Sequence, residues 1–343
     1  MSLKLFFCGL MLAGTFSLSA QHKDDQVLIE TKSLQSAAIR SVQAETDNGN
    51  ISVTGVNDNE ARVEVYAWLG ESSDQEVKRR FAEEYDLKMN TDDNKLTISC
   101  KVKNRHRNSR LSVTFRLYVP VASSTELRTS GGNMHAMKLS GGKHKLVTSG
   151  GNMAFDDIKG EVSGTTSGGN ISISGCSESI KVSTSGGNIS ARESDGTVTL
   201  STSGGNVSLE DLSGDTKAQT SGGNMSASNI TGELTISSSG GNLELTKMSC
   251  ALDASTAGGH LAVDMRKLDK YVKLRNGGSG STRLQLPDNA AVDLSATGHS
   301  VKVDHSGDFT GDMNDHHVKG KLGGGGLPVT IDGGDSRVVV TAK

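Results

Sequence analysis

Two pairs of adjacent acidic residues are the clearest candidates for chemistry in this sequence. Asp156–Asp157 and Glu210–Asp211 could supply the two carboxylates that glycoside hydrolysis requires. They lie far apart along the chain, and no arginine, lysine or aromatic platform accompanies them. We therefore expect exposed turns that serve solubility, and we predict that the protein is not an enzyme.

A histidine-rich segment near the C-terminus is the second candidate. His305, Asp312, Asp315, His316 and His317 carry side chains that can bind zinc. Their spacing matches no recognised metal motif, so a solvated loop is favoured and metal binding stays open. We expect no catalytic residue, no metal site and no cofactor.

The cysteines are the third candidate. After the first twenty residues the sequence holds Cys100, Cys176 and Cys250, an odd number at wide spacing. Such a set does not make a disulfide framework. We expect small buried side chains, with a redox-active thiol as the alternative.

The first twenty residues have the layout of a secretory signal peptide. Lys4 precedes a short apolar stretch at 5–18, and Ser19 and Ala20 offer a small-residue cleavage site. No later segment is long and apolar enough to span a bilayer. We predict an exported protein without a transmembrane span, located in the periplasm, at the cell surface or outside the cell.

A repeat of eighteen residues dominates the rest of the sequence. The segment TSGGN at 148–152 recurs at 166, 184, 202 and 220, recurs with small changes at 238 and 256, and has an earlier copy at 129. Within each unit, counted from the threonine, positions six, eight, eleven, fifteen and seventeen are usually apolar, and position thirteen is often glycine. Alternation of this kind is typical of half-buried strands separated by turns.

One such unit cannot bury its apolar face alone, so the units must stack. We predict an all-β protein, a parallel β-helix (β-solenoid) with eighteen-residue coils that rise about 4.8 Å each. Aromatic residues make up only 3% of the chain, which suits a narrow interior. Calcium-binding β-rolls are disfavoured because an aspartate is missing from the repeat.

The Gly-Gly-Asn element has a structural interpretation. We expect the glycine pair to permit positive φ at a sharp turn, so that valine at Gly187 or Gly205 destabilises the coil. We expect the following asparagines to bond from coil to coil as a ladder. These residues are Asn152, Asn170, Asn188, Asn206, Asn224 and Asn242. An exposed polar stripe that meets a partner is the alternative.

The flanking segments differ from the repeats. Ser73 and Glu76 form a capping box that predicts a helix to about Tyr85, and strands are expected at 62–66, 95–102 and 111–119. We predict three parts: a signal peptide at 1–20, a β-rich N-terminal capping region at 21–128, and a β-solenoid at 129–343. The regular coils occupy 148–260, and degenerate coils follow.

The repeated (T/S)SGGN(I/V/M)S units resemble the bacterial putative-adhesin family, a β-strand-repeat domain of unknown function. The resemblance also covers TDNGNISVTGV at 46–56 and YVPVASS at 118–124. It implies a right-handed β-helix and an exported location, and it carries over no catalytic motif.

We expect a non-catalytic, adhesin-like scaffold that contacts an unknown protein or envelope component. The alternative is a polysaccharide-acting or ligand-binding β-helix protein with a site at a solenoid flank. A formal charge of −3 provides no basic field for nucleic acid. Serine and threonine rows at 183–185 and 201–203 could bind ice or a polymer, but continued alternation would turn Thr184 and Thr202 inward.

Overall fold

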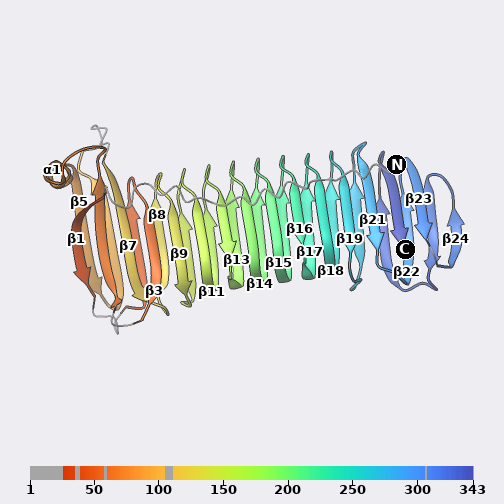
Figure 1. The fold of residues 1–343 in the computed structure, drawn as a ribbon, viewed down its shortest axis with the longest axis horizontal. Helices are drawn as coiled ribbons and strands as arrows, with labels where there is room; N and C mark the ends of the chain where they lie inside the picture. The colour runs from red at the N-terminus through yellow and green to blue at the C-terminus, as the bar shows by residue number, and fades with distance from the viewer. Residues whose placement is uncertain (1–25, 35–38, 58–59, 105–110, 306, 343) are drawn as a thin grey trace, which may run out of the picture.

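The computed structural model describes residues 26–34, 39–57, 60–104, 111–305 and 307–342, and the expected signal peptide lies outside them. These residues are nearly all β, with twenty-seven strands and one helix (Figure 1). The helix is α1 (Asp74–Glu84), and the strands are β1 (Val27–Ser33), β2 (Ser41–Thr46), β3 (Ile51–Val56), β4 (Arg62–Trp68), β5 (Tyr85–Asp92), β6 (Lys95–Val102), β7 (Ser112–Pro120), β8 (Ser124–Thr129), β9 (Met134–Leu139), β10 (Lys143–Val147), β11 (Met153–Thr165), β12 (Ile171–Ser174), β13 (Ser177–Thr184), β14 (Ile189–Thr202), β15 (Val207–Thr220), β16 (Met225–Ser228), β17 (Thr231–Ser238), β18 (Leu243–Thr256), β19 (Leu261–Met265), β20 (Val272–Asn276), β21 (Ser281–Leu286), β22 (Val292–Thr297), β23 (Ser300–His305), β24 (Phe309–Met313), β25 (His317–Leu322), β26 (Leu327–Asp332) and β27 (Arg337–Ala342).

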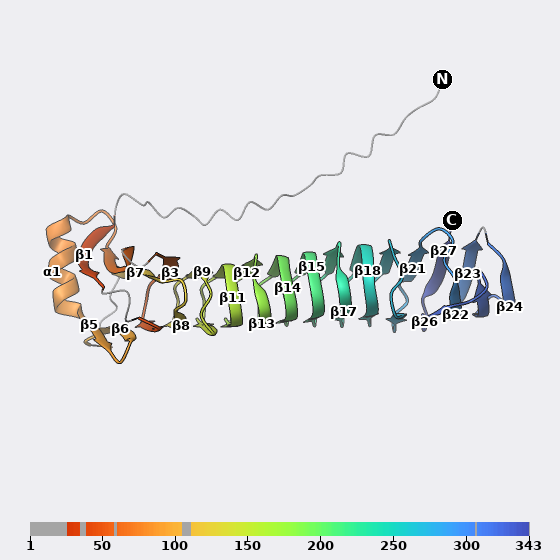
Figure 2. The same ribbon diagram turned by 90° about the horizontal axis from the view of Figure 1, so that it is seen from below.

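The strands stack side by side into a rod with two facing layers (Figures 1 and 2). Each repeat contributes one segment to each layer, and in β14 both segments belong to a single bent strand. Ile171 pairs in parallel with Ile189, and Ile189 pairs with Val207. Neighbouring segments in the middle of the rod therefore come from positions eighteen residues apart, as in a β-solenoid.

Backbone dihedral angles explain where the strands bend. The expected glycine turn at position thirteen is present, because Gly196, Gly214 and Gly232 have φ angles of 96°, 96° and 93°. A second corner lies at position ten, where Glu193 and Asp211 have φ angles of 50° and 53°. The sequence did not reveal this corner, because residues other than glycine are uncommon in the left-handed region.

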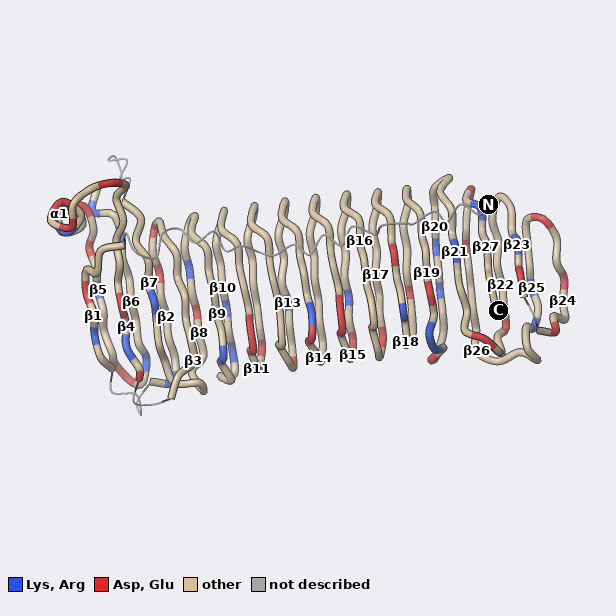
Figure 3. The backbone as a smooth tube through the Cα atoms, viewed as in Figure 1, with Lys and Arg blue, Asp and Glu red and all other residues tan. Residues whose placement is uncertain are grey.

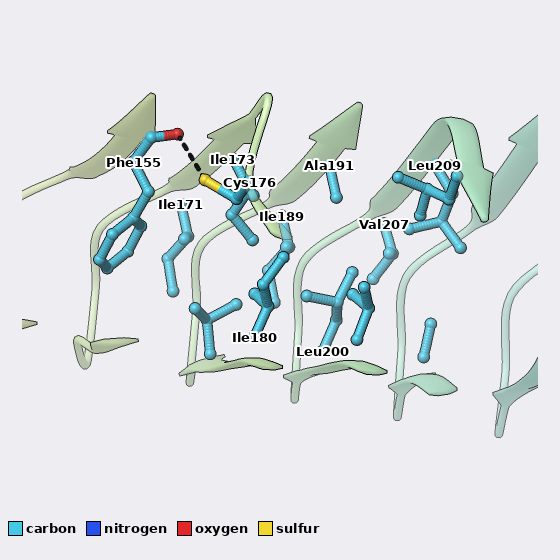
Figure 4. Packing of buried hydrophobic residues seen from close by; sticks show 14 of the residues in the cluster. Phe155, Ile171, Ile173, Cys176, Ile180, Ile189, Ala191, Leu200, Val207 and Leu209 are labelled. Atoms are coloured by element: carbon cyan, nitrogen blue, oxygen red, sulfur yellow. Dashed lines mark hydrogen bonds between the residues drawn. The ribbon is translucent and has the colours of Figure 1, made fainter. Parts of the chain in front are cut away.

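The core consists mainly of aliphatic side chains stacked from coil to coil (Figure 4). Phe155 is the one large ring among the regular coils, and Gly164 makes room for it: a Cβ atom at Gly164 would lie 3.0 Å from the ring. The predicted burial of the cysteines is confirmed for Cys100, Cys176 and Cys250. Burial raises the pKa of these thiols to about 12, 11 and 12, respectively, which keeps them protonated and unreactive.

Near both ends of the rod, the order of the strands in the stack differs from their order along the chain. At the N-terminal end, β2 and β3 lie between β6 and β7 on one side and β8 and β9 on the other. At the C-terminal end, β26 and β27 lie between β20 and β21 on one side and β22 and β23 on the other. The segment at 41–56 is therefore a coil of the stack, although it belongs to the region expected to act as a cap.

Helix α1 covers the N-terminal end of the rod (Figure 2). The capping prediction is confirmed, because Ser73 is the N-cap and its side chain accepts a hydrogen bond of 3.4 Å from the N–H of Glu76. Val77 and Phe81 are buried, and the ring of Phe81 stacks on Tyr85 at 5.6 Å between centroids. In the part of the chain that the structure describes, no helix has the length and apolar character needed to cross a membrane.

Candidate functional site

The repeated TSGGN segments lie one above another along one edge of the rod, which we name the TSGGN edge. It comprises 129–133, 148–152, 166–170, 184–188, 202–206, 220–224, 238–242 and 256–260. None of these segments contains lysine, arginine, aspartate or glutamate, and the charged residues of the regular coils lie away from this edge (Figure 3).

The asparagines of the TSGGN edge form an unbroken series of hydrogen bonds. Oδ1 of Asn170 accepts a bond of 2.8 Å from the backbone N–H of Asn188, and each neighbouring coil repeats this geometry. The accepting residues are Asn50, Asn133, Asn152, Asn170, Asn188, Asn206, Asn224 and Asn242. The donor is a backbone amide in every case, which differs from the amide-to-amide ladder expected.

A second series of hydrogen bonds is buried beneath the first. Oγ1 of Thr184 donates to the carbonyl oxygen of Gly169 in the preceding coil at 2.9 Å and accepts from the N–H of Gly187 at 3.2 Å. Thr184 and Thr202 are buried, at 6% and 4% exposure, so these hydroxyls face the interior. The threonines that repeat this contact are Thr129, Thr148, Thr166, Thr184, Thr202, Thr220 and Thr256, and Ser238 substitutes with the same two bonds.

The glycine pair is required for a reason that the sequence did not reveal. The prediction of positive φ at Gly187 and Gly205 is wrong, because neither residue has a positive φ angle. Instead, a Cβ atom at Gly187 would lie 1.9 Å from the carbonyl oxygen of Gly169. At Gly186 the nearest atom would be 3.9 Å away. Close approach of adjacent coils therefore demands the second glycine of the pair, whereas a Cβ atom at the first would make only an ordinary van der Waals contact.

The two series end on residues that depart from the repeat. Nδ1 of His260 takes the place of an asparagine oxygen and accepts the N–H of Ser281 at 3.0 Å. Asn276 takes the place of a threonine, and its Nδ2 donates to the carbonyl oxygen of Gly259 at 3.1 Å. Sequence reasoning missed both, since their residue types differ from the motif and only the coil geometry reveals their equivalence.

The acidic pairs are not brought together. Asp156 and Glu210 occupy position nine of coils that are three steps apart, which is about 14 Å at 4.8 Å per coil. That separation exceeds the roughly 6.5–9.5 Å of an inverting glycosidase. Asp156 instead pairs with His135 at 2.7 Å, and Asp211 accepts a hydrogen bond from Asn229.

Two histidines of the C-terminal segment, His305 and His316, bond to backbone carbonyls. Nδ1 of His305 lies 2.6 Å from the carbonyl oxygen of Gly307, and Nδ1 of His316 lies 2.6 Å from that of His299. Within the described ranges, no group of three or more His, Cys, Asp and Glu side chains is arranged to hold a metal ion.

A shallow hollow of about 230 Å³ lies on the outer side of β18, β19, β21 and β27. Glu244, Asp264, Arg283 and Gln285 are among the polar residues that line it. It is smaller than the ~300–1,000 Å³ typical of small-molecule sites.

The outer face of the N-terminal end gathers aromatic and arginine side chains. The guanidinium of Arg62 lies 3.7 Å from the ring centroid of Tyr118, and that of Arg116 lies 4.3 Å from that of Tyr66. Trp68, on the same strand as Tyr66, is 37% exposed. We name these five residues the N-terminal aromatic patch.

Comparison with known proteins identifies one family. No curated protein matches the chain. Two solved structures are similar: a putative cell adhesion protein from Clostridium sporogenes ATCC 15579 (10% identity, TM-score 0.24, covering 92% of this chain and 98% of that one) and a putative adhesin from Bacteroides fragilis NCTC 9343 (13% identity, TM-score 0.36, covering 74% and 96%). The family described as Toastrack DUF4097 matches residues 176–335, just under half of the chain. This match to residues 176–335 confirms the family resemblance of the repeats.

Proposed function

We propose that this protein is a non-catalytic, exported, adhesin-like scaffold that acts at the cell surface or in the envelope. The finer description of its fold, a right-handed parallel β-helix with eighteen residues per coil, is part of the same proposal. The parallel pairing of Ile171, Ile189 and Val207 supports the coil length.

One observation carries the proposal: the residues that recur in every repeat are engaged in contacts between coils. The threonine hydroxyl bonds to two glycine backbones, the asparagine oxygen bonds to the next backbone amide, and the second glycine permits the close approach. Residues that make contacts between coils determine the length and stiffness of a rod. A reactive site would instead require side chains that converge on a substrate.

The N-terminal aromatic patch supports a protein as the partner. Tyrosine, tryptophan and arginine are enriched at protein–protein interfaces, and they dominate binding energy there. The rings of Tyr66 and Tyr118 already stack with guanidinium groups, which leaves Trp68 as the exposed ring for contact.

The test is the binding of the fluorescently labelled, purified protein to isolated cell envelopes, with and without prior protease treatment. We expect saturable binding that protease treatment removes and that Trp68→Ala weakens about tenfold or more, as a hot-spot residue would. Thr235→Ala, on the outer side of β17, is the matched control and should bind like the wild type. Absence of saturable binding, or turnover of a polysaccharide by the same preparation, would contradict the proposal.

The hollow beside Arg283 favours the alternative of a ligand-binding protein with a site at a solenoid flank. Its carboxylates and guanidinium could hydrogen-bond a small sugar. Titration of oligosaccharides into the protein and into Arg283→Ala decides this alternative. Binding that the substitution abolishes would support it, and identical heats of dilution from both proteins would exclude it.

A further inference from the structure

The edge of the rod opposite the TSGGN edge carries charges of both signs, which separate along its length. Red predominates at the lower ends of β14 and β15, and blue predominates between β18 and β19 (Figure 3). These charges stand mainly at positions ten and twelve of the repeat, beside the corner where the chain passes from one layer to the other. We name this surface the charged edge. It comprises Glu193, Asp195, Asp211, Asn229, Lys247, Arg266 and Lys267, all of them exposed.

The charge at position ten changes sign about a neutral residue. Asp211, Asn229 and Lys247 follow one another at intervals of eighteen residues. Their φ angles are 53°, 54° and 56°, so their side chains leave the edge in the same direction. The middle coil also presents the uncharged Thr231 at position twelve. An acid and a base therefore lie at equal distances, about 4.8 Å along the rod, on either side of Asn229.

The next coil on each side repeats this reversal with two charges. Glu193 and Asp195 lie one coil before the first acid. On the other side, the backbone N–H groups of Arg266 and Lys267 donate to the carbonyl oxygen of Met248 at 2.8 and 3.2 Å, which places both bases one coil beyond the lysine. The order along the edge is thus two acids, one acid, a neutral coil, one base and two bases.

Position nine, on the adjoining surface of the sheet, is consistent with the same pattern. Arg192 stands two coils before Asn229, and Asp264 stands two coils after it. Glu210, one coil before Asn229, has the uncharged Thr246 as its counterpart one coil after it. Every charge on these five coils at positions nine, ten and twelve therefore has either an opposite charge or a neutral residue at the mirrored place.

The charges of the edge have no oppositely charged partner within their own chain. In the part of the chain that the structure describes, none of its acids and bases forms an ion pair. A partner that satisfies them must carry the reverse order of charges at the same interval between coils. The charged edge of a second copy, turned end for end, carries that order.

Turning the second copy about Asn229 fixes which residues meet. A two-fold axis that lies in the contact and crosses the rods at this residue reverses the order of the coils, but keeps each position of the repeat opposite itself. Asp211 of each copy then faces Lys247 of the other, and the two acids of the preceding coil face the two bases. Parallel rods in register would instead set acid against acid and base against base, which is unfavourable.

We propose that a second copy of this chain docks on the charged edge, side by side and antiparallel, with the two-fold axis at Asn229. Ion pairs between exposed side chains contribute little individually and are screened by salt, so the dimer should be weak and should dissociate as salt increases. The dimer would direct the two N-terminal aromatic patches to opposite ends of the assembly and leave both TSGGN edges free. This inference does not depend on the proposed function.

Sedimentation velocity of the purified protein at several protein and salt concentrations tests the proposal. We expect a monomer–dimer equilibrium whose dissociation constant rises as salt increases from about 0.01 M to about 0.15 M, because the Debye length falls from about 30 Å to about 8 Å. A protein that stays monomeric at every concentration in the lower salt, or a dimer that salt does not weaken, would overturn the proposal.

Two charge reversals at position ten test the register. Lys247→Glu and Asp211→Lys should each raise the dissociation constant about tenfold or more, because like charges then face each other at both contacts. Both variants should fold, since Glu193 and Lys247 already occupy this position with φ angles of 50° and 56°. An equimolar mixture of the two variants should form heterodimers, because each contact again joins an acid and a base.

Lys181→Glu is the matched control. It lies on the outer side of β13, away from the charged edge, and changes the net charge as Lys247→Glu does, so it should dimerise like the wild type. Circular dichroism shows whether each variant is folded. A dimer that Lys247→Glu leaves intact, a control that weakens the dimer equally, or a mixture of the two reversals that stays monomeric would each contradict the antiparallel dimer.

Discussion

Oγ1 of Thr184 donates a hydrogen bond of 2.9 Å to the carbonyl oxygen of Gly169 in the preceding coil. The same hydroxyl accepts the N–H of Gly187 from its own coil. One buried hydroxyl thus hydrogen-bonds to the backbone of two successive coils at the point where the chain turns, and this contact recurs along the whole TSGGN edge.

Replacing Thr202 with valine should destabilise the rod. Valine keeps the shape of the side chain but leaves the carbonyl oxygen of Gly187 and the N–H of Gly205 without their partner. Unpaired buried backbone groups cost about 1–3 kcal/mol. The free energy of unfolding in urea measures the loss. Thr202→Ser is the control and should be much milder, because Ser238 makes both bonds in the native chain. Equal losses for valine and serine would show that the hydroxyl is unimportant.

Replacing Thr216 with valine should have the opposite effect. Thr216 is 3% exposed, and its Oγ1 has no hydrogen-bond partner. Removing an unsatisfied buried hydroxyl while keeping the β-branched shape should stabilise the protein by about 1 kcal/mol. Relative to the wild type, we expect a higher urea midpoint for Thr216→Val and a lower one for Thr202→Val, which would distinguish the unpartnered hydroxyl from the bonded one. A lower midpoint for both would argue against it.

The two glycines of one pair should respond differently to alanine. At Gly187, the added Cβ would lie 1.9 Å from a backbone oxygen, so the coils must move apart, which costs about 1–3 kcal/mol or more. At Gly186 it would meet nothing closer than 3.9 Å, and the change should stay within about 0.5 kcal/mol. Thermal unfolding of the two variants provides the comparison, and similar melting temperatures would contradict the close-approach argument.

The glycine pair shows what periodicity can and cannot reveal. The repeat and its alternation predicted the stacked strands, the burial of Cys176 and the turn at Gly196. They could not distinguish a glycine needed for its φ angle from one needed for contact between coils, because both leave the same letter in the sequence.

The sequence also could not show that residues of different types occupy the same place in successive coils. His260 continues the asparagine series and Asn276 continues the threonine series, and neither matches the motif. The insertion of β27 between β21 and β23 was hidden for a related reason, since stacking order at the ends does not follow chain order.

Buried His144 should make stability depend on pH. Its Nδ1 lies 3.1 Å from Oγ1 of Thr125 and its Nε2 lies 2.9 Å from the carbonyl oxygen of Gly141. Burial lowers the pKa of His144 below its ordinary value of about 6.5. The unfolded chain therefore binds this proton more readily than the folded one. The contribution to stability is complete above about pH 6.5 and is lost as the pH falls below that value.

Replacing His144 with glutamine keeps a hydrogen-bond donor and an acceptor at this position but removes the titrating group. The difference in unfolding free energy between the wild type and His144→Gln should favour the wild type more at pH 7.5 than at pH 5. A difference that does not change with pH would mean that His144 is not the group responsible.

The central claim is that the eighteen-residue repeat is the unit of length of this rod. Deleting residues 184–219 removes two units and joins Ser183 to Thr220, which keeps every coil-to-coil partner in register. Small-angle X-ray scattering of the variant should show a folded rod shortened by about 10 Å, at 4.8 Å per coil. A variant that is unfolded, or folded with its original length, would contradict the claim.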